Sequence, residues 1–319
     1  MNDQAPRPAP PAVGPADLAV SLGPLRLKNP VVAASGTFGY GLELADLCPP
    51  ARLGAVVVKG LSLTPWPGNP LPRIIETAGG LLNSIGLENI GVEAFVRQAL
   101  PPLKAAGATV GANVVGRAVE EYVGATRLLA QSEVDFLELN VSCPNLASPG
   151  GLSFGADPDA AARLTAAAVA AAEGKPLMVK LPPLVADLPL LARRVEAAGA
   201  TAISLVNTLP GLAVDLETRR PKLGRGFGGL SGPPLKPLAL RQTLLCARAV
   251  SVPVVGLGGA FTAEDVLEFI LAGATAVQMG TAILADPTSP LKAIEGLGRW
   301  LGDHGLTGFD DLRGSLQLD

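Results

Sequence analysis

The stretch "PVVGLGGAFTAEDVLEFILAGATAVQMGTA", residues 253–282, decides how this chain folds. A short apolar run ends in glycines, an amphipathic helical pattern follows, and a second apolar run again ends in small residues. The helical part opens with a capping pair, Thr262 and Asp265, and closes on a glycine. Neither apolar run alternates with polar residues, as expected of parallel strands covered on both faces. The stretch therefore predicts a strand, a helix and a second, parallel strand.

The same unit recurs along most of the chain. Short apolar runs rich in β-branched residues are separated, in most cases, by helical patterns. One of these patterns opens with Asp157 as N-cap and Pro158 at the first helical position, and it ends at Gly174. Eight strands are predicted, at residues 30–35, 55–60, 109–116, 135–142, 176–182, 202–208, 253–259 and 276–282, with helices including 91–107, 118–132, 157–174, 187–200 and 262–274.

Eight β/α units in a chain of 319 residues predict an α/β fold, the (β/α)8 TIM barrel, as a single domain. An open doubly wound sheet fits less well, because no G-x-G-x-x-G fingerprint follows the first strand. Residues 18–30 alternate apolar and polar side chains around Gly23-Pro24, which predicts an N-terminal β-hairpin. We expect the barrel domain to span residues 17–319, after a flexible Pro/Ala-rich tail at residues 1–16.

Insertions interrupt the repeat after strands 2, 4 and 6. The first covers residues 61–90, the last covers residues 210–235, and the one between them is a Pro/Gly-rich loop that begins at Cys143. All three follow the carboxyl end of a strand, the side of a barrel on which active sites are assembled. Long ordered loops at such positions are usually functional. We therefore expect the first and last insertions to be loops that form a lid or a substrate wall.

Composition and charge exclude several classes of partner. The net charge is −3 and no basic block is present, so nucleic acid is not an expected partner. No apolar run reaches about 18 residues, so no membrane span is expected. The three cysteines, Cys48, Cys143 and Cys246, are far apart and form neither a disulfide framework nor a metal or cluster ligand set. This cysteine usage fits a reducing compartment, so we expect a cytoplasmic protein.

Polar or small residues stand at the carboxyl ends of all eight predicted strands. A single asparagine at a strand end more often caps a turn than binds a ligand, but eight such positions together favour one shared site. Two lysines would be buried there, and a buried ammonium needs negative charge from a substrate carboxylate or an anionic cofactor. These strand-end residues are Ser35, Lys59, Asn113, Asn140, Lys180, Asn207, Thr208, Gly258, Gly259, Gly280 and Thr281.

The glycines after the last two strands are expected to hold a phosphate. The sequences "GLGGA" and "MGTA" offer backbone N–H groups with little steric bulk, and in TIM barrels this pair of loops frequently binds phosphate. Two tight turns without a ligand are the alternative. No arginine or acidic cluster accompanies the glycines, so we expect a phosphate that is held rather than cleaved.

Cys143 is the candidate for a general base or nucleophile, with a structural role as the alternative. The only histidine, His304, lies outside the eight-unit repeat, which excludes Ser-His-Asp hydrolysis and multi-histidine metal sites. Cys143 follows the fourth strand directly and precedes Pro144. By contrast, Cys246 has helical spacing among leucines and Cys48 precedes two prolines at a helix end, so we expect both to be packed in the structure.

Five motifs in the chain resemble class 1 dihydroorotate dehydrogenases, which are FMN barrel enzymes of pyrimidine synthesis. The resemblance covers essentially the whole chain after Asp17. Residues 68–91 and 207–224 are more similar to the NAD-linked subtype B catalytic subunit than to the fumarate-using subtype A homodimer. The five motifs are "NVSCPN" (140–145), "LLNSIGLEN" (81–89), "VKLPP" (179–183), "GGLSGPPLKP" (228–237) and "GLGGAFTAEDVLEFILAGATAVQMGTA" (256–282).

The resemblance implies oxidation of (S)-dihydroorotate to orotate. Cys143 would remove a proton from C5 while hydride leaves C6 for FMN, and Lys180 would stabilise the negative charge that arises on the reduced flavin. FMN would contact Ser35, Lys59, Gly60, Asn113, Asn140, Lys180, Val206 and Gly232, with its phosphate at Gly258, Gly259, Gly280 and Thr281. Orotate would contact Lys59, Asn83, Ser84, Ile85, Gly86, Leu87, Asn140, Asn145, Asn207 and Thr208.

The resemblance also implies a partner. Subtype B enzymes pass electrons to NAD+ through FAD and a 2Fe-2S cluster, yet this chain lacks both a cluster ligand set and a dinucleotide fingerprint. Both groups are therefore expected on a separate electron-transfer subunit, bound to a homodimer core in a heterotetramer. The first alternative is a self-sufficient fumarate-reducing homodimer. The second, less favoured, is a non-redox phosphate-binding barrel such as an isomerase.

Overall fold

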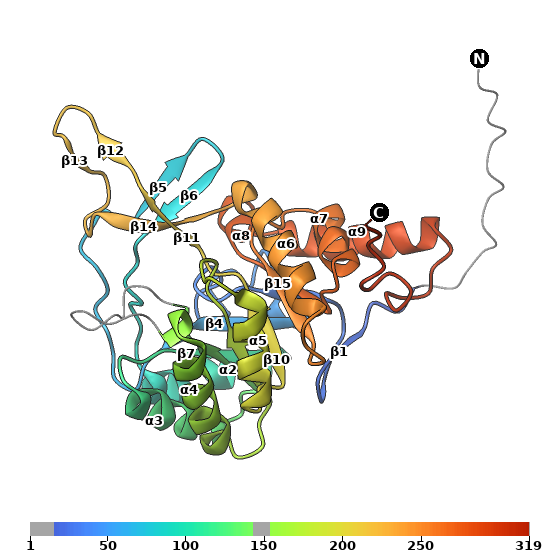
Figure 1. The fold of residues 1–319 in the computed structure, drawn as a ribbon, viewed down its shortest axis with the longest axis horizontal. Coiled ribbons are helices and arrows are strands. Elements are labelled where there is room, and N and C mark those ends of the chain that lie inside the picture. Colours follow the sequence, from blue (N-terminus) through green and yellow to red (C-terminus); the bar gives the residue numbers. More distant parts are fainter. Residues whose placement is uncertain (1–15, 143–153, 319) are drawn as a thin grey trace.

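The computed structural model describes residues 16–142 and 154–318. In this part of the chain, eight parallel strands form a closed barrel (Figure 1). The order around the barrel follows the chain, with each strand paired to the next and the last paired to the first. Every one of the eight predicted strands is confirmed. They are β3 (Val31–Ala33), β4 (Ala55–Leu61), β7 (Val110–Val114), β8 (Phe136–Asn140), β9 (Leu177–Lys180), β10 (Ala202–Leu205), β15 (Val254–Leu257) and β16 (Ala276–Met279).

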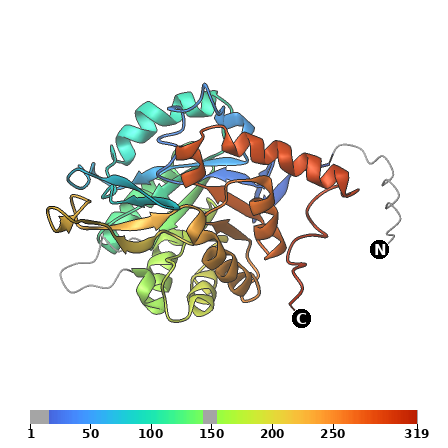
Figure 2. The same ribbon diagram turned by 90° about the horizontal axis from the view of Figure 1, so that it is seen from above.

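Helices surround the barrel and cover the outer faces of its strands (Figure 2). The interface between helices and strands is built from aliphatic side chains such as Leu129, Leu164 and Val266, which are fully buried. The helices are α1 (Val92–Ala94), α2 (Leu100–Ala105), α3 (Val119–Ala130), α4 (Pro158–Ala171), α5 (Leu188–Ala197), α6 (Lys236–Ala247), α7 (Ala263–Leu271), α8 (Thr281–Ala285) and α9 (Ser289–Asp303), with short 3-10 turns at Pro50–Arg52, Phe154–Ala156 and Pro233–Leu235.

The helix starts follow the capping chemistry predicted from the sequence. The Asp157 carboxylate accepts a hydrogen bond from the backbone N–H of Asp159 at the start of α4. At the start of α7, Thr262 and Asp265 form a reciprocal capping box, each side chain accepting from the other residue's backbone N–H. Both caps satisfy N–H groups that have no partner inside the helix.

The helix predicted for residues 91–107 is interrupted. After α1, the segment η2 (Phe95–Ala99) forms a wider π-helical turn, and α2 resumes at Leu100 with prolines among its first residues. Pro101 and Pro102 have no N–H group to donate, so the regular hydrogen-bond ladder cannot run through them. The element is helical along its length but changes its pitch ahead of the two prolines.

The predicted N-terminal hairpin is confirmed at the amino-terminal end of the barrel. Strands β1 (Val20–Leu22) and β2 (Leu25–Leu27) pair antiparallel, and Gly23 makes the turn at a φ of 60°. A Cβ on Gly23 would lie 3.2 Å from the carbonyl oxygen of Thr201, which precedes β10. The hairpin therefore lies against the end of the barrel opposite the carboxyl ends of the strands.

The first and last insertions were predicted to be loops, and that prediction is wrong. The first contributes β5 (Ile74–Thr77) and β6 (Gly80–Asn83), the last contributes β11 (Leu209–Leu212) and β14 (Phe227–Ser231), and the four strands form one antiparallel sheet in the order β11-β14-β6-β5. A short hairpin, β12 (Val214–Asp215) with β13 (Arg220–Pro221), projects from it (Figure 1). Strand β6 contains Gly80 and strand β14 contains Gly228 and Gly229, and glycines inside strands weaken the strand pattern in the sequence.

The insertion predicted after the fourth strand falls at residues 143–153, outside the described residues, as do residues 1–15 of the predicted tail and the last residue. Within the described ranges, no helix combines the length and apolar character needed to cross a bilayer. In the same ranges, no group of three or more His, Cys, Asp and Glu side chains is arranged to hold a metal ion.

Candidate active site

A cavity of about 360 Å³ lies at the carboxyl ends of the barrel strands, within the size range of small-molecule sites. All eight strands contribute residues at or just beyond their carboxyl ends to its lining. The small antiparallel sheet forms a wall of the cavity through residues that include Ile74, Leu81 and Phe227. Two segments separated by more than a hundred residues therefore enclose one side of the cavity together.

The structure brings together every predicted site residue that it describes. Cys143 and Asn145 lie outside the described residues, so their place in the site stays a prediction. The predicted residues that line the cavity are Ser35, Lys59, Gly60, Asn83, Ser84, Ile85, Gly86, Leu87, Asn113, Asn140, Lys180, Val206, Asn207, Thr208, Gly232, Gly258, Gly259, Gly280 and Thr281.

Lys180 places a buried positive charge in the cavity. Lys180 is 5% exposed, and its Nζ donates a hydrogen bond to the Ser35 hydroxyl at 3.3 Å. No Asp or Glu in residues 16–142 and 154–318 forms an ion pair with it. A buried ammonium with only a neutral partner is costly, and a bound anion would offset that cost. The arrangement fits a ligand that carries or acquires negative charge beside β9.

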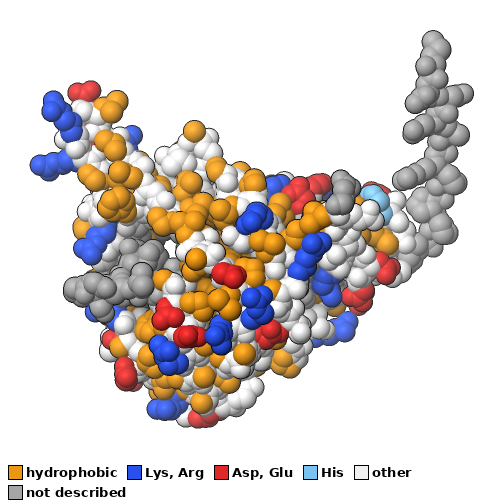
Figure 3. Space-filling model, in the orientation of Figure 1, with side chains coloured by type: hydrophobic (Ala, Val, Ile, Leu, Met, Phe, Trp, Pro, Cys, Tyr) orange, Lys and Arg blue, Asp and Glu red, His pale blue; other side chains and the backbone are white. Residues whose placement is uncertain are grey.

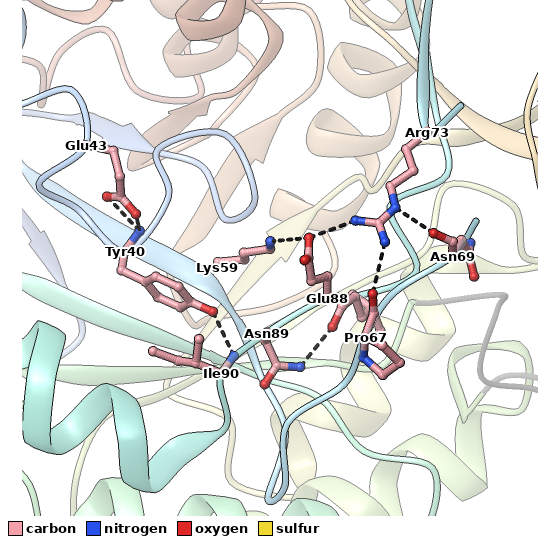
Figure 4. Close-up of polar contacts among 10 residues, drawn as sticks. Tyr40, Glu43, Lys59, Pro67, Asn69, Arg73, Glu88, Asn89 and Ile90 are labelled. Atoms are coloured by element: carbon pink, nitrogen blue, oxygen red, sulfur yellow. Dashed lines mark hydrogen bonds and ion pairs between the residues drawn. The ribbon is translucent and has the colours of Figure 1, made fainter. Parts of the chain in front are cut away.

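Lys59 belongs to a group of three charged side chains at the edge of the cavity (Figure 4). The Glu88 carboxylate lies 3.5 Å from the Lys59 Nζ and 2.8 Å from the Arg73 guanidinium. Arg73 also donates to the backbone oxygens of Asn69 at 2.6 Å and Pro67 at 2.9 Å, which hold it in place. Two cations share one carboxylate, so the group keeps one net positive charge for an anionic ligand.

The segment that carries Glu88 is held by its own polar contacts (Figure 4). The Asn89 amide donates to the backbone oxygen of Leu87 at 2.8 Å, and the backbone N–H of Ile90 donates to the Tyr40 hydroxyl at 3.0 Å. Burial raises the pKa of Tyr40 above its usual value, so the hydroxyl stays protonated at neutral pH. These contacts link the first insertion to the loop after β3.

Three glycines meet where the loops after β14 and β15 approach each other. Gly232, Gly258 and Gly259 have φ values of 102°, 126° and 79°, in the region that favours glycine. A Cβ on Gly259 would lie 2.8 Å from the backbone nitrogen of Lys236 and 2.9 Å from the oxygen of Gly232. Among the described residues, nothing accepts a hydrogen bond from the backbone N–H of Gly259 or Thr281. These free donors fit an anionic group such as a phosphate.

Glu138 is a buried site residue that the sequence analysis missed. It lies within the apolar run of β8 and is 0% exposed, and its carboxylate accepts a hydrogen bond from the Asn113 amide of the cavity wall. The sequence signal was available, because an acidic residue in an otherwise apolar buried strand is costly unless it is hydrogen-bonded. Glu88 and Arg73 were missed for a different reason, since both lie in a segment whose strands could not be recognised.

The two thiols that the structure describes lie away from the cavity, as predicted. Cys48 and Cys246 are both buried. Burial raises the pKa of Cys48 to about 11 and that of Cys246 to about 12. Neither can supply a thiolate at neutral pH. His304 also lies apart from the cavity, at the end of α9, where its ring stacks on Trp300 with centroids 3.8 Å apart.

Comparisons with known proteins agree with this architecture. The model of the dihydroorotate dehydrogenase family matches residues 17–301. The catalytic subunit of dihydroorotate dehydrogenase B (NAD(+)) from Trichlorobacter lovleyi is 50% identical over 94% of this chain and 98% of its own length. A putative dihydroorotate dehydrogenase A (fumarate) from Solibacter usitatus is also 50% identical, over 94% and 99%. A solved dihydroorotate dehydrogenase from Eimeria tenella, in complex with ferulenol, superposes with a TM-score of 0.77 at 22% identity, covering 94% of this chain and 88% of that one.

Proposed function

The chain belongs to the dihydroorotate dehydrogenase family, and from that membership we propose that it oxidises (S)-dihydroorotate to orotate in pyrimidine biosynthesis. The observation that carries the proposal is the pair of lysines in the cavity. Lys180 is buried without a carboxylate partner among the described residues, and Lys59 belongs to a group with net positive charge. Two separate sites for negative charge suit an anionic substrate bound beside an anionic cofactor.

FMN fits the donors that surround the cavity. The N–H groups near Gly258, Gly259, Gly280 and Thr281 would hold its phosphate, at the two loops that most often bind phosphate in barrels. Ser35, Asn113 and Lys180 would contact the remainder of the cofactor, with Lys59, Gly60, Asn140, Val206 and Gly232 completing the contact set. When bound, FMN supplies the acceptor for the hydride that leaves the substrate.

The chain's own residues bind the substrate and move its proton. Lys59 would bind the carboxylate of dihydroorotate, and the Asn207 and Thr208 side chains would hydrogen-bond the pyrimidine edge. The Cys143 thiolate would take the proton from C5, which leaves the thiol protonated. The electron pair of the C5–H bond would form the C5=C6 double bond of orotate, while the hydrogen on C6 leaves with its electron pair as hydride. Asn83, the segment from Ser84 to Leu87, Asn140 and Asn145 complete the proposed substrate contacts.

The chain purified with its bound cofactor gives a direct test of this function. We expect a yellow protein whose flavin absorbance is bleached by dihydroorotate under anaerobic conditions, with one orotate formed per flavin. A colourless protein that binds phosphorylated sugars, or a yellow one that dihydroorotate does not bleach, would contradict the proposal. A colourless protein is the result expected if the chain is a non-redox phosphate-binding barrel.

For the electron acceptor, the observation that favours NAD+ is the name of the relatives, several of which are catalytic subunits of the NAD(+) enzyme. Under this proposal a second subunit carries FAD and a 2Fe-2S cluster and binds a homodimer of this chain. Exposed apolar side chains on and around the small sheet support a contact surface there (Figure 3). Phe227 on β14 is 69% exposed, Leu71 ahead of β5 is 77% exposed, and Leu216 between β12 and β13 is 84% exposed.

Fumarate is the second candidate acceptor, because the relative from Solibacter usitatus is named as a putative fumarate enzyme and is 50% identical to this chain, as is the NAD(+) enzyme from Trichlorobacter lovleyi. The chain purified alone distinguishes the two. Robust dihydroorotate-dependent reduction of fumarate would contradict the NAD-linked assignment. Turnover with NAD+ that requires a co-purified subunit containing FAD and iron would contradict the fumarate assignment.

Arg73→Met is expected to raise KM for dihydroorotate with little change in kcat. Without the guanidinium, the Glu88 carboxylate neutralises Lys59 alone and competes with the substrate carboxylate. The group is partly exposed, so we expect a modest effect, about 2- to 5-fold. Steady-state kinetics with Glu88→Gln as the matched variant checks the idea, because that change frees Lys59 and should leave KM equal or lower. A higher KM in Glu88→Gln with an unchanged KM in Arg73→Met would refute this view of the group.

Gly259→Ala is expected to lower the fraction of protein that retains FMN. The new Cβ would contact the backbone of Lys236, and the φ of residue 259, 79°, is unfavourable for alanine. The loop must therefore shift away from the proposed phosphate position. The ratio of flavin to protein absorbance after purification measures the loss. Gly298→Ala on α9 is the control, because its Cβ would meet nothing within 4 Å. Equal flavin content in the two variants would argue against a phosphate at this loop.

A further inference from the structure

Glu138 is a fully buried carboxylate that contacts the cavity wall through Asn113 and has no role in the proposed chemistry. It accepts hydrogen bonds from the Asn113 amide at 2.6 Å, the Ser204 hydroxyl at 2.9 Å and the Gln278 amide at 2.6 Å. No lysine or arginine in the described ranges forms an ion pair with it. These donors come from β7, β10 and β16, so the carboxylate connects four strands of the barrel interior.

A chain of hydrogen bonds runs from Glu138 to the cavity wall. The Asn113 amide oxygen accepts from the Asn140 amide nitrogen at 3.3 Å, and the Asn140 oxygen accepts from the Ser142 hydroxyl at 2.8 Å. The Ser142 oxygen in turn accepts from the Asn207 amide nitrogen at 2.7 Å. Asn113, Asn140 and Asn207 all line the cavity. The chain therefore joins three proposed ligand-binding amides to one buried acceptor.

The direction of this chain follows from the chemistry of its first member. Both Glu138 oxygens accept hydrogen bonds, so Asn113 turns its NH2 group toward Glu138 and its oxygen toward Asn140. Asn140 must then turn its own NH2 group toward Asn113, which leaves its oxygen for Ser142. An amide in isolation could take either orientation. Here Glu138 decides the orientation of Asn113, and the backbone N–H groups of Ser142 and Thr208 hold the oxygens of Asn140 and Asn207 in the matching sense.

We propose that Glu138 is a positioning residue that orients the Asn113 amide and, through it, holds the Asn140 amide, so that Asn140 offers an N–H donor to the ligand beside that of Asn207. The oxygens of Asn140 and Asn207 are occupied by Ser142 and by the Thr208 backbone N–H, respectively. The ligand favoured by this order is rich in acceptors, such as a pyrimidine with carbonyl and carboxylate oxygens. The inference rests on the proposed function and specifies how its substrate site is oriented.

A purely structural role for the network makes a different prediction. Stability alone does not require a carboxylate here, because well-packed apolar residues often replace buried polar groups at no loss. A structural network would therefore affect unfolding and would leave ligand affinity unchanged in the folded protein. The positioning role predicts that the affinity for orotate depends on the hydrogen-bond acceptor at residue 138, independently of the stability of the variant.

Glu138→Met and Gln278→Met form the matched pair that separates these roles. Both remove one part of the network, but only the first removes the acceptor that orients Asn113. In the FMN-loaded protein we expect the Kd for orotate to rise about 10-fold or more in Glu138→Met, because mis-oriented buried amides lose hydrogen bonds to the ligand. In Gln278→Met we expect a change of less than about threefold. Calorimetric titration gives the affinity, and the melting temperature of each variant gives its stability.

Glu138→Gln tests whether hydrogen-bond order or charge is responsible. The Gln278 oxygen has no hydrogen-bond partner, so the Gln278 amide can turn over and accept from the new NH2 group. The new carbonyl then still accepts from Asn113, and the order of the chain is kept. We expect the orotate Kd to stay within about threefold of the unaltered protein. A loss as large as that of Glu138→Met would overturn the proposal and assign the effect to charge.

Ser142→Ala keeps the proposal falsifiable if Glu138→Met does not fold. This change breaks the chain between Asn140 and Asn207, at a buried residue just beyond the end of β8, and should weaken orotate binding by a similar factor. Unchanged orotate affinity in Ser142→Ala or in folded Glu138→Met would overturn the positioning role while leaving the proposed function intact. Failure of the unaltered protein to bind orotate would contradict both.

Discussion

Replacing Lys180 with methionine is expected to slow flavin reduction by dihydroorotate about 100-fold or more, the usual effect of removing one preorganised electrostatic group. Methionine keeps the length and apolar stem of lysine but removes the ammonium. Lys180 is buried, its only described polar partner is the Ser35 hydroxyl, and it faces the cavity. None of the described residues therefore compensates its charge, which is available to negative charge that develops on the cofactor.

Rapid mixing of the FMN-loaded variant with dihydroorotate under anaerobic conditions measures this rate directly. Lys180→Arg is the matched control, because it keeps the charge while changing the geometry, and it should lose less than Lys180→Met. A second measurement concerns the protein without cofactor. Because no carboxylate in the described part of the chain pairs with the buried ammonium, the melting temperature of the cofactor-free Lys180→Met protein should be equal to or above that of the unaltered protein. An unchanged reduction rate in Lys180→Met would refute the electrostatic role.

Cys143→Ala is expected to retain bound FMN and to lose about 10²- to 10⁴-fold in turnover, the range of general acid–base catalysis. The expectation comes from the sequence, since Cys143 lies outside the described residues. Cys143→Ser should keep a small activity that rises with pH, because a hydroxyl gives up its proton less readily than a thiol. Steady-state rates over a range of pH, with flavin content measured in parallel, check both variants. Near-normal turnover in Cys143→Ala would remove this residue from the mechanism.

The other two cysteines provide the control. Burial raises the pKa of Cys48 to about 11 and that of Cys246 to about 12, so both remain protonated at neutral pH and should react slowly with alkylating reagents. Treatment with iodoacetamide should therefore inactivate the enzyme through Cys143, and orotate should protect it. Cys246→Ala should lower the melting temperature but not turnover in the folded protein. Inactivation that tracks modification of Cys246 would contradict this assignment.

The barrel itself was predictable because its signals are local. Each strand is a short run of β-branched apolar residues, and helices such as α4 and α7 are marked by caps at Asp157 and Thr262 that act within one turn. The ring of strand-end residues followed from the barrel, since parallel strands deliver their carboxyl ends to the same side. Lys59 and Lys180, on β4 and β9, therefore line the same cavity.

The small sheet over the cavity was not predictable in the same way. Its strands β6 and β14 pair Asn83 with Gly229, residues that are far apart in the chain and have no strand signal of their own. The pairing exists because the barrel brings the loops after β4 and β10 to the same end of the molecule. The contact of Glu88 with Lys59 forms where the first insertion folds back on β4, and it was missed because the strands of that insertion were not recognised.

The sequence by itself determined the eight-unit barrel, the helix caps and the identity of the strand-end side chains, because each depends on residues within a turn or a strand of one another. Only the tertiary structure decided which charges pair, how the two insertions join into one wall, and how Glu138 orders the amides above it. Those features depend on contacts between distant segments. Such contacts form only once the barrel has closed and its burial has removed water as a competing partner.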